Sequence, residues 1–378
     1  MKWQVPFLVL VMCLGGAAQA QVWRVDPTAP GVPDGLTWAT AYPTIQQAID
    51  MAYAAGGGQV WVAGGTISSP RIYDEVRTEA WGAPASVTGS LVMKDNVQVY
   101  GGFSGYNSGA GRQETQLSER NRYLFPTVID GSTARAGSPA YHVVVFGRAT
   151  AATVNARLDG FYIQGGNASG VTGDYHTWRG GGIFVWRSSP VIANCVIRNN
   201  VAEVSGGGIA LEAAGSTDAA NAVIENCLIV QNTANRGLDS SSNPIRGGAG
   251  IFNNQSAPEI KFMTNANNTL TDNASGLFGL NSGGVYNWDG SPVINSCIFA
   301  ALPGAVITEG PSGSTSAPVI SYTRAGVLYP GPGNITANAL LDADWMPQPG
   351  SPCIDTADPA AHGTDLRGVT RPVNGVSD

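Results

Sequence analysis

Four side chains in this sequence carry groups that could act on a charged polysaccharide. They are the cations Arg187, Arg198 and Lys261 and the imidazole of His176, which lies in the polar segment 168–179. Elimination from a uronate needs a positive charge to neutralise the sugar carboxylate, often calcium held by acidic side chains, and a base of lowered pKa. The four residues are scattered and have no acidic cluster with calcium-ligand spacing beside them. We interpret each of the four as a solvated side chain. Because no acidic cluster accompanies them, we predict no metal site.

Aromatic residues suggest a different chemistry, because flat rings stack against the C–H faces of sugars. Five fall on one outward side of the predicted strands: Phe184, Trp186, Phe252, Tyr286 and Trp288. Tyr175 and Trp178 would join them if their segment folds over the strands. A contiguous exposed stripe would mark a glycan-binding surface. Aromatic residues also favour strands for packing reasons alone, and a loop could cover them. A glycan-binding stripe and a covered, purely structural one therefore both stay open.

Hydrolysis of a glycosidic bond is not indicated. It requires carboxylates that converge on one sugar, so that one donates a proton while another activates water. The sequence has no Asp-Asp pair within a repeat, no Gly-His-Gly and no Arg-Ile-Lys, and its one related string is Ala361-His-Gly363.

The elements that must position these residues are repeats. Each combines a glycine cluster, a short apolar strand, an Asn-Cys or related pair and an Asn-rich turn. The copies begin at Gly180, Gly206, Gly247 and Gly283, and a weaker copy runs from Leu158. One such unit cannot bury its apolar face alone and must stack on its neighbours. Alternating apolar residues and the absence of a sustained helical period make the units strands, so we predict an all-β, parallel β-helix.

The period-2 alternation predicts which side chains point inward. The inward columns are Ile183, Ile209, Ile251 and Val285, and, two residues on, Val185, Leu211, Asn253 and Asn287. The outward columns are Phe184, Ala210, Phe252 and Tyr286, and then Trp186, Glu212, Asn254 and Trp288. Ile192, Cys195 and Ile197 also point inward.

Asparagines recur at the predicted turns in two columns. One contains Asn194, Asn226 and Asn267, and the other contains Asn200, Asn232 and Asn273. Amides could recognise sugars or ions, but stacked Asn side chains also tolerate unusual backbone angles and hydrogen-bond along a stack. We interpret both columns as scaffold.

The ends of the chain suggest export. Lys2, an apolar run from Val5 to Leu14 and the string Ala18-Gln-Ala20 predict a signal peptide at residues 1–20, cleaved before Gln21. No later apolar run has the length of a membrane span. Without residues 1–20 the chain has 19 basic and 27 acidic residues, a net charge of −8, which makes nucleic acid an unfavourable partner.

Four cysteines remain after that cleavage: Cys195, Cys227, Cys297 and Cys353. An even number in an exported chain can indicate disulfides. Three of them fall in one inward column, where a free thiol packs as a small hydrophobe. Stacked thiols are therefore preferred, although a bridge between Cys195 and Cys227 on neighbouring coils is sterically conceivable.

The remaining segments are expected to close the solenoid. Thr44-Ile-Gln-Gln47 has the form of a capping box, and the apolar spacing after it predicts a short amphipathic helix over the N-terminal end. Residues 66–89 and 167–180 interrupt coils. We therefore divide the chain into a signal peptide (1–20), a parallel β-helix with its N-terminal cap (21–300), and last coils with a C-terminal cover (301–378).

These features resemble the secreted bacterial right-handed parallel β-helix proteins of the pectin-lyase-like superfamily, including those with varied C-terminal surface anchors. The residues that carry the resemblance are Asp34 to Tyr42, Val99 to Gly105, Thr127 to Gly131, Leu158 to Asn167, the Gly-Gly-Gly-Ile repeats and Gly350 to Asp355. The coils are also similar to repeats of polymorphic outer-membrane adhesins. Such relatives usually continue beyond Arg371-Pro-Val, whereas this chain stops at Asp378, as in a freely secreted or a truncated protein.

The resemblance implies a right-handed fold and export, with the activity left unassigned. We expect a secreted or cell-surface protein that presents a glycan-facing or adhesion surface to an extracellular polysaccharide or surface glycan. The alternative is a uronate polysaccharide lyase. If Arg187, Arg198 or Lys261 lies within about 5 Å of a carboxylate pair in a cleft, the lyase gains support; dispersed cations with exposed aromatics would favour binding.

Overall fold

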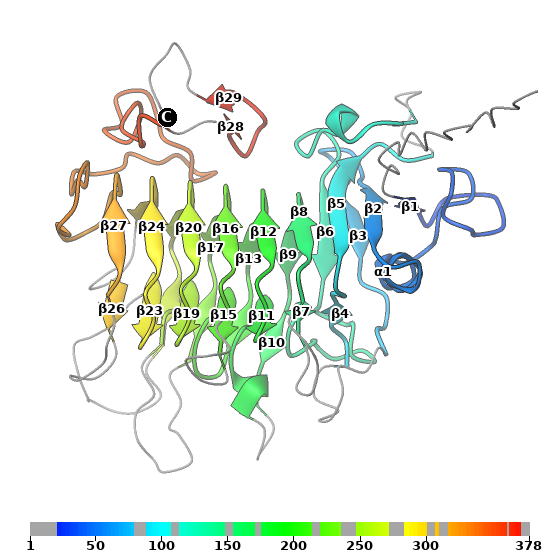
Figure 1. The fold of residues 1–378 in the computed structure, drawn as a ribbon, viewed down its shortest axis with the longest axis horizontal. Coiled ribbons are helices and arrows are strands. Elements are labelled where there is room, and N and C mark those ends of the chain that lie inside the picture. The colour runs from blue at the N-terminus through cyan, green and yellow to red at the C-terminus, as the bar shows by residue number, and fades with distance from the viewer. Residues whose placement is uncertain are drawn as a thin grey trace, which may run out of the picture.

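The computed structural model describes residues 21–78, 88–106, 113–147, 154–170, 175–213, 220–235, 247–271, 283–300, 307–309, 317–360 and 363–371. Residues 1–20, the predicted signal peptide, lie outside this part. The described strands form four parallel sheets that run side by side along the molecule, and one short hairpin (Figure 1).

The largest sheet, called the front sheet below, contains β1 (Val22–Val25), β2 (Gly58–Ala63), β5 (Val97–Phe103), β8 (Arg157–Asp159), β12 (Val191–Ala193), β16 (Val223–Glu225), β20 (Glu259–Lys261), β24 (Val293–Asn295) and β27 (Val319–Ser321). The second contains β3 (Arg71–Tyr73), β6 (Thr127–Asp130), β9 (Tyr162–Gln164), β13 (Val196–Arg198), β17 (Leu228–Val230), β21 (Thr264–Ala266) and β25 (Ile298–Ala300). The third contains β4 (Leu91–Val92), β7 (Val144–Phe146), β11 (Ile183–Trp186), β15 (Ile209–Glu212), β19 (Ile251–Asn254), β23 (Val285–Trp288) and β26 (Ile307–Glu309). The fourth contains β10 (Asn167–Ala168), β14 (Val201–Ala202), β18 (Thr233–Ala234) and β22 (Thr269–Leu270), and the antiparallel hairpin consists of β28 (Gly363–Thr364) and β29 (Thr370–Arg371).

Each coil visits these sheets in turn, so strands that follow one another in a sheet come from successive repeats. The predicted inward columns are confirmed, since Ile183, Ile209, Ile251 and Val285 pair in register and are fully buried. Ile192, Cys195 and Ile197 belong to the same continuous core. The alternation of one apolar and one outward residue therefore determines the face that each side chain occupies.

The buried asparagines form the expected scaffold. Asn200 donates from Nδ2 to Oδ1 of Asn232 at 3.0 Å, and Asn232 donates in the same way to Asn268 at 3.0 Å. All three are at most 1% exposed. Asn268 therefore continues this ladder in place of Asn273, which lies outside the described residues.

The prediction of the other asparagine column, Asn194, Asn226 and Asn267, is wrong for Asn267. Glu225 pairs with Lys261, so Asn226 aligns with Phe262 at the next position. Asn267 instead follows β21 at a different corner, in line with Asn199 and Gln231. Both corners of a coil need positive φ, with values of 53° at Asn226 and 51° at Asn267. Because Asn is favourable at either corner, aligning the repeats by residue type assigned Asn267 to the wrong corner.

The interpretation of the cysteines as packed thiols is confirmed. Cys195, Cys227, Cys297 and Cys353 are all free and buried. Burial raises the pKa of the Cys297 thiol to about 12.

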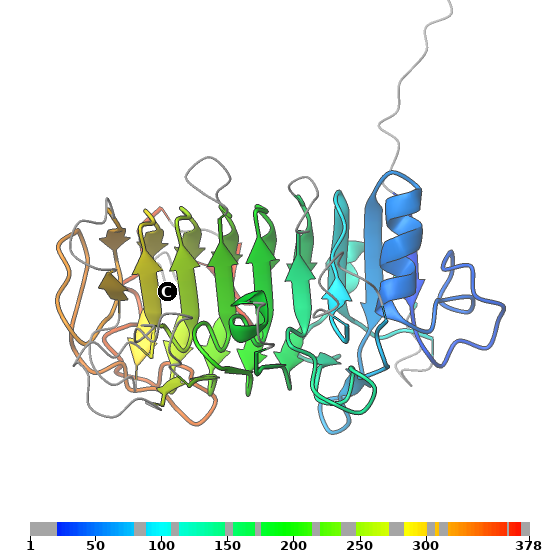
Figure 2. The same cartoon turned by 90° about the horizontal axis from the view of Figure 1, so that it is seen from below.

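The predicted N-terminal cap is present as α1 (Ile45–Ala54), which lies at one end of the stack of coils (Figure 2). Thr44 accepts a hydrogen bond from the Gln47 amide at its N-terminus, as the capping motif requires. Ile45, Ala48, Ile49 and Ala52 are fully buried against the first coils. No helix in the described ranges is both long and apolar enough to cross a membrane.

After β27 the chain turns back over the coils. Residues 322–360 and 363–371, here called the C-terminal cover, lie above the ends of the front-sheet strands and finish in the β28–β29 hairpin (Figure 1). They place Arg371 beside residues from the middle of the chain.

Candidate functional site

The predicted aromatic stripe has the expected register but is not an exposed surface. Phe184, Phe252 and Tyr286 are at most 2% exposed, and Trp186 is 8% exposed. Trp288 is half-buried and packs at their edge. The expectation of an exposed stripe is therefore wrong, and the alternative that a loop covers it holds.

The cover comes from segments that pack on the third sheet. His142 stacks on Phe184 with the ring centroids 4.8 Å apart, and His176 meets Trp186 edge-on at 4.6 Å. The Arg179 guanidinium lies 5.0 Å from the centre of the Phe252 ring. His176 thus packs on the rings of Phe184 and Trp186.

The 3₁₀ turn η3 (Tyr175–Trp178) brings His176 to this position. Trp178 is half-buried and lies so close to Gly170 that a Cβ there would meet its Nε1 atom at 2.1 Å. The Tyr175 side chain lies outside the described part. Arg179 continues from the turn into a 3.0 Å ion pair with Glu212, whose side chain is 1% exposed.

The three cations singled out in the sequence lie on, or directly after, strands of three different sheets. Arg187 follows β11 with a φ of 48°. Arg198 ends β13, where it donates to Gln164 at 3.1 Å and lies 5.2 Å from the centre of the Tyr162 ring. Lys261 ends β20 of the front sheet. They do not form one site.

Lys261 lies between two carboxylates. Its Nζ atom is 3.2 Å from Glu259 Oε1 and 3.7 Å from Glu225 Oε2. All three side chains line a cleft of about 500 Å³, which we call the ionic cleft, together with Arg157, Asp358 and Arg371. The condition that favours the lyase alternative is therefore met at Lys261.

The ion pairs continue along the front sheet. Arg157 Nη2 is 3.1 Å from Glu225 Oε1 and 2.7 Å from Asp159 Oδ2, and Arg120 lies 2.7 Å from the other oxygen of Asp159. Burial alone would raise the pKa of Asp159, but the two guanidiniums outweigh it and lower the pKa. Asp159 is a fixed, buried anion, whereas the Glu225 and Lys261 side chains are 28% and 29% exposed.

The coil corners next to this row are also connected. Asn194 donates to Asp159 at 2.8 Å, and Asn226 donates to Asn194 at 2.6 Å. Arg371 reaches Asn226 Oδ1 at 3.3 Å and lies 4.6 Å from the centre of the Phe262 ring. The C-terminal cover thus forms one wall of the ionic cleft.

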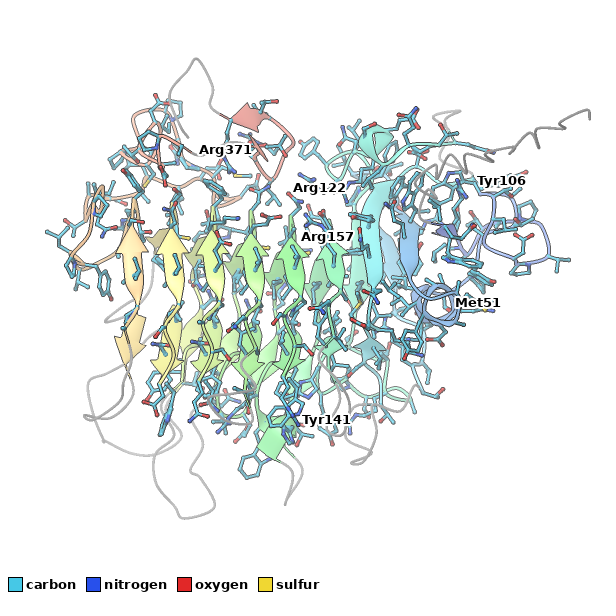
Figure 3. All side chains as sticks on the ribbon, viewed as in Figure 1. Met51, Tyr106, Arg122, Tyr141, Arg157 and Arg371 are labelled. Carbon is cyan, nitrogen blue, oxygen red and sulfur yellow. The ribbon has the colours of Figure 1, made fainter. Side chains whose placement is uncertain are left out.

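A contact on the other side holds the cover near the N-terminal coils. Arg122 donates to the carbonyls of Asp365 and Leu366 at 3.2 and 3.3 Å. Figure 3 shows Arg122, Arg157 and Arg371 along the same edge of the front sheet.

Sequence reasoning missed Arg157, Glu225, Glu259 and Arg371. A usable signal existed for three of them, because Arg157, Glu225 and Glu259 each flank an inward aliphatic residue, and the strands align in register. Reading the outward neighbours of Ile192 and its equivalents would have placed polar residues in adjacent columns. No local pattern points to Arg371, which meets the cleft only through the path of the C-terminal cover.

The arrangement offers hydrogen-bond donors and acceptors at fixed positions. Glu225 Oε2 and Glu259 Oε1 both contact the Lys261 Nζ atom, so the two carboxylates face the same part of the cleft. Within the described ranges, no group of three or more His, Cys, Asp or Glu side chains is placed to hold a metal ion.

Comparison with known proteins bears on the fold. A family model for a right-handed β-helix region matches residues 130–299. A pectin methylesterase from Aspergillus niger, in two deglycosylated forms, is 16% identical over 87% of this chain and 90% of its own, with a TM-score of 0.33. The A-module of a mannuronan C-5 epimerase from Azotobacter vinelandii is 15% identical over 78% of this chain and 84% of its own, with a TM-score of 0.30. The search of curated proteins finds no match. The matched region and the parallel sheets together confirm the predicted fold, a right-handed parallel β-helix.

Proposed function

We propose that this protein is an exported β-helix protein that binds an extracellular polysaccharide or surface glycan in the ionic cleft. The observation that carries the proposal is the convergence of Arg157, Glu225, Glu259 and Lys261 from different coils in one cleft. Paired, half-exposed charges present donors and acceptors in fixed directions, which suits the adjacent hydroxyls of a sugar. The site replaces the aromatic stripe as the glycan-facing surface.

The proposal of export rests on the predicted signal peptide at residues 1–20. An exported protein that binds glycans without altering them would act in adhesion or display. The ionic cleft lies on the outside of the coils, where a polymer can enter without being threaded.

The test is a binding measurement against a panel of neutral and uronate polysaccharides by affinity electrophoresis, followed by calorimetry on the best ligand. We expect Lys261→Ala and Glu259→Gln each to weaken binding about tenfold, because each loses charge-assisted hydrogen bonds. Arg198→Ala is the matched control for a lost cation, since it lies on another sheet. Glu203→Gln is the matched control for a lost carboxylate.

Two results would count against the proposal. One is the absence of binding across the panel. The other is binding that both cleft variants leave unchanged.

A second candidate is a polysaccharide lyase, and the carboxylate pair around Lys261 is the observation that favours it. In this reaction a base removes the proton at C5 of a uronate, the C4–O bond breaks, and the departing sugar oxygen takes up a proton. Lys261, held between the two carboxylates, would face the uronate carboxylate together with Arg157 or Arg371, and one carboxylate of the pair would take the proton. Release of unsaturated uronates, followed by ultraviolet absorbance with and without calcium, tests the candidate. A signal that disappears in Lys261→Ala supports it, and a flat trace with every uronate rejects it.

A further inference from the structure

We propose that an apolar chamber beside the ionic cleft binds an aryl ester substituent of the glycan, of the hydroxycinnamoyl type. This inference rests on the proposed function, because it names the class of glycan that the cleft accepts. The residues that it concerns lie outside the ion pairs of Arg157, Glu225, Glu259 and Lys261.

The chamber has a volume of about 300 Å³ and lies between the C-terminal cover and the coils that carry β17, β21 and β25. Its lining includes Leu228, Met263 and Ile298 from those coils. Asn226, Phe262 and Arg371 line both the chamber and the ionic cleft. The two spaces are therefore neighbours across a shared wall, and a group attached to a sugar in the cleft can reach the chamber.

Three aromatic residues of the chamber have an unusual backbone. Phe262, Tyr322 and Trp345 have φ values of 52°, 49° and 64°, and they are the aromatic residues with positive φ within the described ranges. All three line the chamber. Such angles cost a bulky residue about 1–3 kcal/mol, and residues held in them cluster at ligand sites.

Neighbouring coils show that the backbone does not demand aromatic residues here. The equivalent corners before Phe262 are Asn194 and Asn226, which adopt φ of 54° and 53° at little cost. The later corners of this column are Phe262, Ser296 and Tyr322, and all three line the chamber that the C-terminal cover encloses. Packing alone would be served by aromatics on the strands, so the rings at these corners are best explained by what they enclose.

Size and chemistry select the occupant. A cavity of about 150 Å³ accommodates benzene, so a chamber of twice that volume is too large for a methyl or acetyl group and fits a substituted ring. Aromatic walls and the thioethers of Met263 and Met346 favour contacts with a ring over contacts with a saturated chain. Arg371, stacked on Phe262, brings its guanidinium to the wall that the chamber shares with the ionic cleft.

The experiment compares feruloylated pectic oligosaccharides with the same material after treatment with a feruloyl esterase, using calorimetry on the full chain. We expect the esterified form to bind about tenfold more tightly, which is the gain that one stacked ring gives. Trp345→Ala and Tyr322→Asn, which lie outside the ionic cleft, should reduce the preference below about twofold and leave the affinity for the de-esterified form unchanged. Tyr322→Asn restores the residue type of earlier corners, so it should fold with an unchanged or higher Tm. Tyr53→Ala on α1 is the control for loss of a ring.

Each other outcome has a clear meaning. Equal affinity for both forms overturns the inference and leaves the proposed function standing. A preference that survives both variants places the ring elsewhere and also overturns it, and an equal gain from a butyryl ester overturns its aromatic specificity. Failure of both forms to bind, in a preparation that also binds no other glycan, removes the proposed function and the inference together.

Discussion

The side chain of Asn232 shows how a single buried amide can hold several neighbours. It donates to the carbonyls of Ile197 and Val230 and to Asn268, and it accepts from Asn200. All of these contacts are inside the coil, away from water. An amide at this position therefore connects its own coil to both neighbouring coils.

Replacing Asn232 with Leu should lower the free energy of unfolding by at least about 3 kcal/mol, because several buried polar groups lose their partners. Urea denaturation followed by circular dichroism measures this. The same substitution at the exposed Asn155 should change stability by less than about 0.5 kcal/mol. A comparable loss of stability in Asn232→Leu and Asn155→Leu would show that the asparagine ladder does not account for the effect.

Asp159 leads to a prediction about acid. Its pKa is lowered in the folded state, so the stability that it contributes is present above its unfolded pKa and is lost as the pH falls through the folded value. Asp159→Asn should cost about 3 kcal/mol at neutral pH, because Arg120 and Arg157 lose a buried partner. The variant should also flatten the decline in stability as the pH falls below about 4, the ordinary pKa of an aspartate.

Thermal or urea unfolding across this pH range, compared with the variant Asp344→Asn at an exposed site, tests the assignment. Parallel pH profiles for wild type and Asp159→Asn would contradict it.

At the scale of elements, the coil corners limit which residues can follow each strand. Asn199 has a φ of 53° and an exposed side chain, so its conformation can be tested without disturbing the core. Asn199→Val should destabilise the protein by about 2 kcal/mol, since a β-branched residue is strained at positive φ. Asn199→Gly should be nearly neutral.

Chemical denaturation of this pair gives the comparison. Equal stability of the Val and Gly variants would mean that the corner can adopt another conformation at no cost.

The front-sheet strands show why the ionic cleft forms at this place. The strands β16, β20 and β24 each contribute one inward isoleucine, and their last residues, Glu225, Lys261 and Asn295, line the cleft beside the C-terminal cover. Stacking at about 4.8 Å brings Glu225 and Lys261 from separate coils into one row. Neither coil alone contains the site.

At the scale of the whole molecule, Arg122 links the first third of the chain to the C-terminal cover. It packs over Gly160, where a Cβ would meet its Cδ at 2.8 Å, and donates to the carbonyls of Asp365 and Leu366. Burial lowers the pKa of Arg122, yet the guanidinium keeps these two acceptors. The contact joins the loop after β5 to the C-terminal cover.

Arg122→Ala should loosen the cover, so that trypsin cleaves after the exposed Arg367 about tenfold faster while the coils stay intact. Mass spectrometry of the C-terminal fragment measures the rate, and Arg198→Ala is the control. An unchanged rate would show that other contacts hold the cover in place.

The sequence alone was sufficient for the coil fold, the inward columns, the asparagine ladder as a scaffold and the capping helix. These features depend on interactions within one repeat or between adjacent repeats, and an alternating pattern records them directly. The slip at Asn267 arose because both corners of a coil accept the same residue type.

Only the tertiary structure decided which surface is available. His142, His176 and Arg179 pack on Phe184, Trp186 and Phe252 of the aromatic stripe. No local sequence pattern predicts that these segments fold back over the sheet. Likewise, Arg371 meets Asn226 across 145 residues of chain. Contacts of this kind depend on where a non-repeating segment returns to the coils, and that path is set by long-range packing, which the repeat pattern does not encode.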